Sequence, residues 1–266
     1  MRLIFALVLA LSASAADIRL LVCGDDGGSS HSINDGTILA FDKGIERCAN
    51  VIVPGPWFND IARRLNERPG IGVGVHLTLT SEWDDLKWRP LTRGKTIVDA
   101  DGYLPSTTRG FLENKPNIAE VEAELRAQIE RARRSISQVG WLWPHMGTAV
   151  ATPELRALTD RLAKEYGLPL LGAASGIKNV RHPQGPDLAI ALKDWLQKLE
   201  PGTYFFIEHP ATDTAEARAM GHVGYTDVAL QRAAIVKAWT DPEVKRVIEK
   251  RGIELLTPEA ARAALQ

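Results

Sequence analysis

The segment that most constrains the fold is residues 20–28, with the sequence LLVCGDDGG. A continuous apolar run of this kind is typical of a strand buried on both faces of a parallel sheet. The run ends at Asp25 and Asp26, and the carboxyl ends of parallel strands are where α/β folds place their chemistry. Adjacent carboxylates raise each other's pKa unless a positive charge lies between them. The segment therefore favours a parallel α/β fold with a cation near the two acids, and the plainer alternative is a helix N-cap and a turn.

Strand-like and helix-like segments alternate along the rest of the chain. Further strands are expected at residues 51–53, 70–79, 141–145, 168–171, 204–207 and 253–256. Helices are expected at residues 34–44, 58–66, 117–136, 152–167, 186–199, 227–240, 242–251 and 258–265. Such alternation builds a parallel sheet, and about 250 residues suffice for one barrel. We therefore predict one α/β domain over residues 16–266, a (β/α) barrel that is distorted or incompletely closed.

The first residues have the pattern of a secretory signal peptide. Arg2 precedes an apolar run over residues 3–11, and the small residues 13–15 (ASA) follow it. The run is too short to be a transmembrane helix. A buried first strand is the alternative, but alanine and serine are unfavourable in strands. We predict that residues 1–15 are a signal peptide cleaved after Ala15 and that the mature protein is exported.

The charge balance and the length of the apolar runs argue against two classes of partner. The net charge is −1 and 24% of the residues are charged, so there is no basic surplus to attract nucleic acid. No run of about 18 apolar residues predicts a membrane span. We therefore expect that the protein neither binds nucleic acid nor spans a membrane.

The two cysteines, Cys23 and Cys48, are expected to be free. A pair in an exported protein invites a disulfide. However, the expected strands place Cys23 near the end of the first strand and Cys48 at the start of the second. Those positions lie at opposite ends of parallel neighbours, beyond the Cα separation of roughly 7 Å that a disulfide can bridge. We therefore predict two free, buried thiols.

Three histidines occupy positions like that of the paired acids. His76, His145 and His209 each follow an apolar run, at or just past the end of an expected strand. Barrel strands end on one common face. Two imidazoles and a carboxylate there form an open site for one divalent ion, and a second carboxylate can accept a proton. For a single histidine a structural role is the plainer interpretation, but three at strand ends favour a metal site.

Several motifs resemble those of one enzyme family. They are GDDG at residues 24–27, GVGVHLTLTSEW at 72–83, PHMGT at 144–148 and EHPA at 208–211. Segments such as VPGPWF at residues 53–58 extend the resemblance over nearly the whole mature chain. The block around His76 is its most specific part. The sequence thus resembles the YdjC/ChbG-type carbohydrate deacetylases.

This resemblance implies a distorted (β/α) barrel that removes acetyl groups from N-acetylated oligosaccharides with one divalent metal ion. By motif match, Asp26, His76 and His145 are the metal ligands and Asp25 is the general base. His209 is then the general acid, or the group that stabilises the developing charge. Two imidazoles and one carboxylate favour Zn²⁺. The alternative is Mg²⁺, which is less favoured because it prefers oxygen ligands.

The sequence departs from the family pattern before His145. The family segment usually begins Asp-Ser-His or Asp-Gly-His, whereas Trp143 and Pro144 stand here. Loss of that acid removes an expected partner of the metal site. One alternative is therefore a sugar-binding barrel with weakened or no turnover. Another is a glycoside hydrolase that uses Asp25 and Asp26, which is disfavoured because adjacent strand residues point to opposite faces.

Aromatic residues near the strand ends are candidates for binding a sugar. Trp83 and Trp88 lie in residues 81–117, a segment without sustained periodicity and long enough to suggest a functional loop. Trp57 follows another expected strand. The alternative for Trp83 and Trp88 is that they fasten the loop to the barrel, and for Trp57 it is core packing.

Overall fold

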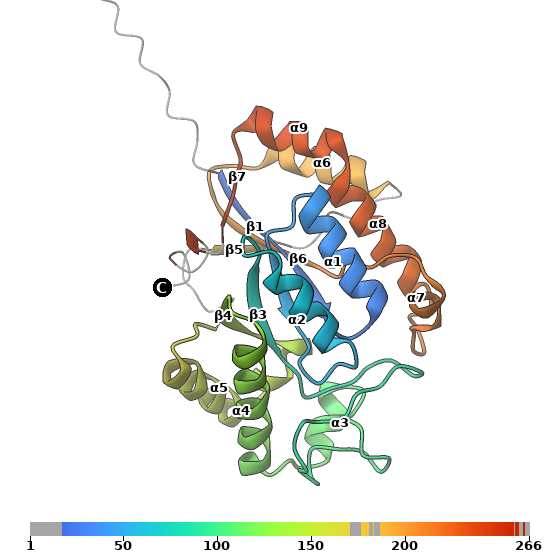
Figure 1. Cartoon of the computed structure of the whole chain (residues 1–266), viewed down its shortest axis with the longest axis vertical. Coiled ribbons are helices and arrows are strands. Elements are labelled where there is room, and N and C mark those ends of the chain that lie inside the picture. The colour runs from blue at the N-terminus through green and yellow to red at the C-terminus, as the bar shows by residue number, and fades with distance from the viewer. Residues whose placement is uncertain are drawn as a thin grey trace, which may run out of the picture.

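Parallel strands form one curled sheet in the computed structural model, which describes residues 18–170, 177–180, 183, 187–257, 259–260 and 263 (Figure 1). The strands are β1 (Ile18–Gly27), β2 (Cys48–Val51), β3 (Gly72–Leu77), β4 (Val139–Pro144), β5 (Ile177–Val180), β6 (Gly202–Glu208) and β7 (Glu254–Leu255). Their order is β4-β3-β2-β1-β6-β5, with β7 paired to the start of β1. Because β4 and β5 end the sheet without pairing to each other, it is a half-barrel. The predicted α/β class and incompletely closed (β/α) barrel are confirmed.

Helices cover the convex side of the sheet. They are α1 (His31–Lys43), α2 (Phe58–Asn66), α4 (Ile118–Ser135), α5 (Pro153–Tyr166), α6 (Leu188–Lys198), α8 (Val228–Thr240) and α9 (Pro242–Arg251). Two shorter helices lie outside this layer: α3 (Thr108–Glu113) contacts the segment after β4, and α7 (Ala215–Ala219) contacts α1 and α8. A 3-10 helix, η1 (His145–Val150), follows β4. Contacts run from α6 through α8, α1, α2 and α4 to α5, so the helices form an arc that follows the strand order (Figure 1).

The two faces of the sheet carry different side chains. Along β3, Val73, Val75 and Leu77 belong to the apolar core between the sheet and helices α2, α4 and α5. The alternate residues of a strand point the other way, so Gly72, Gly74 and His76 face the inside of the curl. A Cβ atom on Gly74 would overlap the Trp141 indole and the Asn50 amide. The β3 glycines therefore leave room for an indole inside the half-barrel, below the histidine at the strand end.

Most helices begin and end close to where the sequence predicts them. Helices α2 and α9 have the expected bounds. Helix α1 starts three residues early because the Ser30 hydroxyl accepts a hydrogen bond from the Ile33 amide and caps it. Leu39, expected on the apolar side of this helix, is exposed. Strand β5 was not predicted, and residues 168–171 contribute only the bridge of Leu170 to Leu142 within the described part of the chain.

Some predictions fall outside the described residues. The proposed signal peptide over residues 1–15 lies there completely, and most of the expected helix over residues 258–265 does as well. Among the helices that are described, none is long and apolar enough to cross a membrane.

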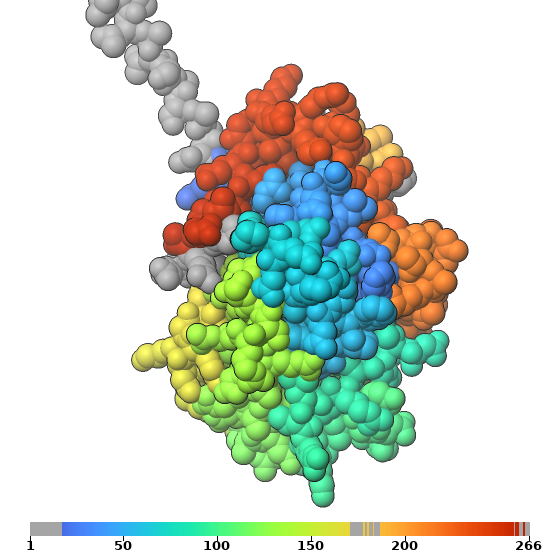
Figure 2. All heavy atoms as spheres, in the orientation of Figure 1, coloured from blue at the N-terminus to red at the C-terminus, as the bar shows by residue number. Residues whose placement is uncertain are grey.

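The segment that follows β3, teal to green in Figure 2, covers the lower end of the molecule beside α2.

Cys23 and Cys48 form a disulfide, so the prediction of two free thiols is wrong. The two residues are register partners in β1 and β2, with Cα atoms 4.5 Å apart. The error lay in the register, because β1 has 10 residues and β2 only 4. Strand β2 starts opposite the second half of β1, which places its first residue beside Cys23.

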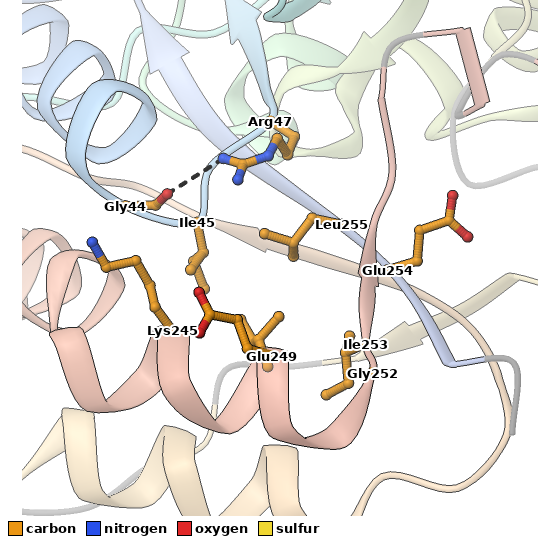
Figure 3. A pocket seen from close by; sticks show the side chains of 10 residues that line it. Gly44, Ile45, Arg47, Lys245, Glu249, Gly252, Ile253, Glu254 and Leu255 are labelled. Atoms are coloured by element: carbon orange, nitrogen blue, oxygen red, sulfur yellow. Dashed lines mark hydrogen bonds between the residues drawn. The ribbon is translucent and has the colours of Figure 1, made fainter. Parts of the chain in front are cut away.

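A pocket of about 510 Å³ lies at the amino ends of the strands, between the α1–β2 connection and α9 (Figure 3). Lys245 and Glu249 of α9 and Arg47 line it, together with residues next to β7. Strand β7 pairs with the start of β1, whereas Asp25 and Asp26 lie near the end of β1. This pocket is therefore at the opposite end of the sheet from the paired acids.

Removal of the disulfide is expected to destabilise the fold. In a Cys23→Ala/Cys48→Ala variant, the loss of a crosslink that closes a 25-residue separation should lower the free energy of unfolding. The expected loss is about 2–4 kcal/mol in urea denaturation followed by circular dichroism. Denatured, unreduced wild-type protein should show no reactive thiol in a colorimetric assay. Two free thiols per chain would contradict the assignment.

Candidate metal centre

A β-bulge near the end of β1 turns both acids toward one point. Gly24 pairs with Ala49 and Gly27 with Val51, so β1 contains one residue more than β2 over this stretch. Asp26 has a φ of 67°, in the left-handed region, and the Ser29 amide and hydroxyl both donate to its carbonyl oxygen. Bulges of this kind redirect side chains next to active sites. The expectation that Asp25 and Asp26 point to opposite faces is therefore wrong.

Three buried side chains from three strand ends meet beside this bulge. Asp26 Oδ1 lies 3.4 Å from His76 Nε2 and 3.4 Å from His145 Nδ1. The two imidazole nitrogens are 3.2 Å apart. These three residues are the ligands that the family resemblance implies, and among the described residues they form a cluster able to hold a metal ion.

Hydrogen bonds on the far side of each ring fix which nitrogens face the cluster. His76 Nδ1 lies 3.1 Å from the Trp143 carbonyl oxygen, which can only accept, so Nδ1 carries the proton and Nε2 a lone pair. His145 Nε2 lies 2.9 Å from the Glu82 carboxylate, so the neutral ring carries its proton on Nε2 and presents the lone pair of Nδ1. Asp26 Oδ1 is buried and has no hydrogen-bond donor among the residues the structure describes. When both rings are neutral, three electron-pair donors face one another, and a cation between them stabilises this arrangement.

The spacing of these donors fits a tetrahedral ion. Zinc binds imidazole nitrogen and carboxylate oxygen at about 2.1 Å, so two ligands at the tetrahedral angle are about 3.4 Å apart. The three observed separations are 3.2, 3.4 and 3.4 Å. An octahedral ion with the same bond lengths needs about 3.0 Å between adjacent ligands. The residues present therefore fit a divalent metal, and their spacing is closer to the tetrahedral value.

The electrostatics of the cluster favour positive charge. Burial lowers the pKa of His145, but the Glu82 and Asp26 carboxylates outweigh it and raise that pKa to about 10. Burial also opposes ionisation of Asp26, yet His209 and Arg232, with help from the imidazoles, hold the pKa of this carboxyl well below its ordinary value. The protein thus keeps Asp26 ionised and stabilises a cation beside it.

Arg232 and Glu82 support the cluster, and sequence reasoning missed both roles. Arg232 Nη2 donates to Asp26 Oδ2 across 3.0 Å, and its guanidinium lies 5.1 Å from the Trp83 ring. The available signal was an arginine within the apolar stripe of α8 that includes Val228 and Trp239. Glu82 lies in the HLTLTSEW block and orients His145. His145 therefore has an acidic partner, although the family's acid is absent at Trp143 and Pro144.

Asp25 lies beside the cluster, with its carboxylate held by two hydrogen bonds. Its Oδ1 accepts a hydrogen bond from Asn50 Nδ2 at 2.7 Å, and its Oδ2 accepts one from Trp143 Nε1 at 2.9 Å. The same Oδ2 lies 3.6 Å from His76 Nε2. A buried carboxylate therefore stands next to the cluster, held by two neutral donors.

His209 follows the end of β6, next to β1 in the sheet. Its side chain is 40% exposed and its Nδ1 lies 3.6 Å from Glu208. Burial lowers its pKa, but the charge of Asp26, together with Glu208 and Asp25, raises it above the ordinary value. The structure thus places His209 at the accessible rim of the cluster, where its protonated form is favoured.

The three candidate sugar-binding tryptophans lie in different surroundings. Trp57 is 39% exposed and packs against the His31 ring, with centroids 4.7 Å apart. Trp83 and Trp88 are each only 2% exposed and belong to an apolar cluster that also contains Ile33 and Leu104. They fasten the 81–117 segment to the half-barrel, whereas part of the Trp57 indole is exposed.

Comparison with known proteins shows the family of the chain. The profile of the family described as "YdjC-like protein" matches residues 19–250. The chain belongs to the YdjC-like family. Its relatives include a protein named carbohydrate deacetylase from Thermus thermophilus, which is 32% identical over 272 residues and is matched over 92% of this chain and 94% of its own length. A Geobacillus stearothermophilus protein of the same name is 26% identical over 89% of this chain and 95% of its own length.

A solved structure shares the fold of this YdjC-like protein. It is an Enterococcus faecalis protein described as a candidate cellobiose-phosphate cleavage protein. The two superpose with a TM-score of 0.77 over 92% of this chain and 99% of the other, at 23% identity. The half-barrel is thus an architecture that a distant sequence also adopts.

Glu82→Gln should weaken metal binding without unfolding the protein. The variant replaces the carboxylate that orients His145 with a neutral amide, and loss of such partners costs about 10–100-fold in metal affinity. Competition titration of metal-free protein with Zn²⁺ and a chromophoric chelator measures the change. Glu113→Gln, which alters an exposed ion pair with Arg109, is the matched control and should bind like wild type. Equal affinity in all three proteins would contradict a supporting role for Glu82.

Proposed function

We propose that this YdjC-like protein is a metal-dependent deacetylase that removes acetyl groups from N-acetylated, chitooligosaccharide-like sugars. The observation that carries the proposal is the triangle of donor atoms on Asp26, His76 and His145, 3.2–3.4 Å on a side, with both ring tautomers fixed. The names of the relatives supply the substrate class. The donor set and its spacing favour Zn²⁺, and Mg²⁺ is the alternative.

The residues around the centre divide the work of amide hydrolysis. When bound, a divalent ion lowers the pKa of water and polarises an acyl oxygen. The Asp25 carboxylate accepts the proton of the attacking water, because it is buried beside the cluster and is not a member of it. His209, on the accessible rim with its pKa raised, donates a proton to the departing sugar nitrogen. Arg232 keeps Asp26 ionised and oriented.

Trp57 is the candidate contact for a sugar ring. Its exposed indole follows β2 in the sequence, and its backbone amide donates to the carbonyl of Gly28, just after the bulge. This places an apolar surface close to the paired acids. The buried Trp83 and Trp88 support the wall of the site from behind and make no direct contact with substrate in this proposal.

We also propose that the protein is exported. The support is the signal-like sequence of residues 1–15 together with the Cys23–Cys48 disulfide. Disulfides form and persist in oxidising compartments and are rare in the cytosol of most organisms.

Two other functions make different use of the same residues. A sugar-binding barrel without turnover is favoured by the departure at Trp143 and Pro144, although Glu82 restores an acidic partner to His145. A glycoside hydrolase requires two carboxylates on either side of the bond that breaks. Asp25 and Asp26 instead approach the same nitrogen of His76, at 3.6 and 3.4 Å, which disfavours that assignment.

Metal removal should abolish acetate release. Purified protein is expected to contain about one equivalent of divalent metal and to release acetate from N-acetylglucosamine oligomers. Treatment with a strong chelator should stop the reaction, and added Zn²⁺ should restore it. Acetate release from metal-free protein would exclude the proposed mechanism. Stoichiometric metal and oligosaccharide binding without acetate release would instead identify the non-catalytic sugar-binding protein.

Substitutions should separate the ligand from the base. Asp25→Asn should lower kcat by about 10²–10⁴-fold while the protein keeps its metal, because only proton transfer is impaired. Asp26→Asn should lose the metal itself. Metal analysis and steady-state kinetics of both variants test this, with the exposed Asp213→Asn as a control that should match wild type. Loss of metal in Asp25→Asn would reassign that residue as a ligand.

A further inference from the structure

Trp143 contacts both halves of the centre through different atoms. Its carbonyl oxygen lies 3.1 Å from His76 Nδ1, and its indole Nε1 donates to Asp25 Oδ2 at 2.9 Å. We propose that Trp143 is the positioning residue of the proposed deacetylation: its indole N–H fixes the Asp25 carboxylate in the orientation of a general base. The inference rests on the proposed function and assigns to this tryptophan a role specific to this chain.

The contact reaches the oxygen of Asp25 that matters for proton transfer. Oδ2, which accepts from Trp143, is also the oxygen 3.6 Å from His76 Nε2, on the side of the metal-ligating atoms. A hydrogen bond to this atom sets both its distance from the cluster and the direction of its remaining lone pair. An indole N–H can donate but cannot accept, so it binds the carboxylate without competing for the proton that the base must take.

A second chain of hydrogen bonds fixes the other oxygen of Asp25. Asn50 Nδ2 donates to Oδ1 at 2.7 Å, and Trp141 Nε1 donates to Asn50 Oδ1 at 2.8 Å. Because Trp141 can only donate, it determines which end of the Asn50 amide faces Asp25. The two neutral donors together hold the carboxylate plane without placing a further charge beside it.

The indole of Trp143 is itself held in place. Trp143 is the register partner of His76 in the pairing of β4 with β3. This pairing holds the Trp143 backbone, and with it the starting point of its side chain, beside His76. The ring packs edge-on against buried Phe205, with centroids 5.5 Å apart. Rotation of the ring away from Asp25 would break this aromatic contact. A rigid donor of this kind maintains the geometry that a functional site requires.

A double-mutant cycle separates positioning from packing. Trp143→Phe keeps an aromatic ring for the contact with Phe205 and removes the indole N–H together with the five-membered ring that carries it. If Trp143 acts through Asp25, this variant lowers kcat on N-acetylglucosamine oligomers about 10–100-fold. Its KM and metal content remain near wild type. In an Asp25→Asn background the same substitution causes no further loss, because the base it positions is absent. An equal loss in both backgrounds, or no loss in either, would overturn the proposal.

Trp239→Phe is the matched control. Trp239 is buried on the convex side of the sheet, and its indole nitrogen has no hydrogen-bond partner in the part of the chain that the structure describes. This variant should keep wild-type kcat in both backgrounds. Thermal denaturation of all variants shows whether a loss of activity follows a loss of folded protein.

A spectroscopic readout on metal-free protein tests the contact independently of activity. Substitution by Phe identifies the indole N–H signal of Trp143 in a ¹⁵N–¹H correlation spectrum. Asp25→Asn keeps the tryptophan and should shift this signal upfield, since an amide accepts more weakly than a carboxylate. An unshifted signal would overturn the contact. If wild type releases no acetate, the proposed function fails, whereas normal kcat in Trp143→Phe rejects only the role of Trp143.

Discussion

The bulge at the end of β1 is the constraint on which the centre depends. A regular strand would direct one of two adjacent carboxylates into the helical layer and leave a charge buried there without a partner. The extra residue and the left-handed backbone of Asp26 direct both toward the inside of the curl instead. Such a conformation costs about 1–3 kcal/mol and persists where surrounding interactions require it. Here the hydrogen bonds from Ser29 to the Asp26 carbonyl and from Arg232 to the Asp26 carboxylate hold that conformation.

Around this bulge, each side chain of the centre has a partner that fixes its orientation. His76 is held by a backbone carbonyl of β4, His145 by Glu82, and Asp26 by Arg232. These partners come from a strand, from the long segment after β3, and from a helix late in the chain. The site is thus a product of the whole half-barrel. The acid that is absent before His145 has a counterpart in Glu82, which comes from a different segment of the chain.

The positions of the strand ends could be predicted from the sequence, but the contacts between strands could not. His76 and His145 could be placed beside Asp26 because apolar runs end there and parallel strands end on one face. The pairing of Cys23 with Cys48 could not, because register depends on how far one strand extends past the next. The bulge gave no local signal either, since GDDG is equally compatible with an ordinary turn. The contact of Arg232 joins residues 206 positions apart, which no pattern of local periodicity encodes.

The disulfide lies closer to the chemistry than its place in the core suggests. Cys23 and Cys48 each stand two residues before a member of the hydrogen-bonded pair Asp25 and Asn50, on the same face of their strands. The crosslink therefore ties together the two strands directly beneath that carboxylate. Protein produced in a reducing cytosol would lack this tie while keeping His76 and His145 on uncrosslinked strands. The redox history of a preparation thus bears on the alignment of this acid.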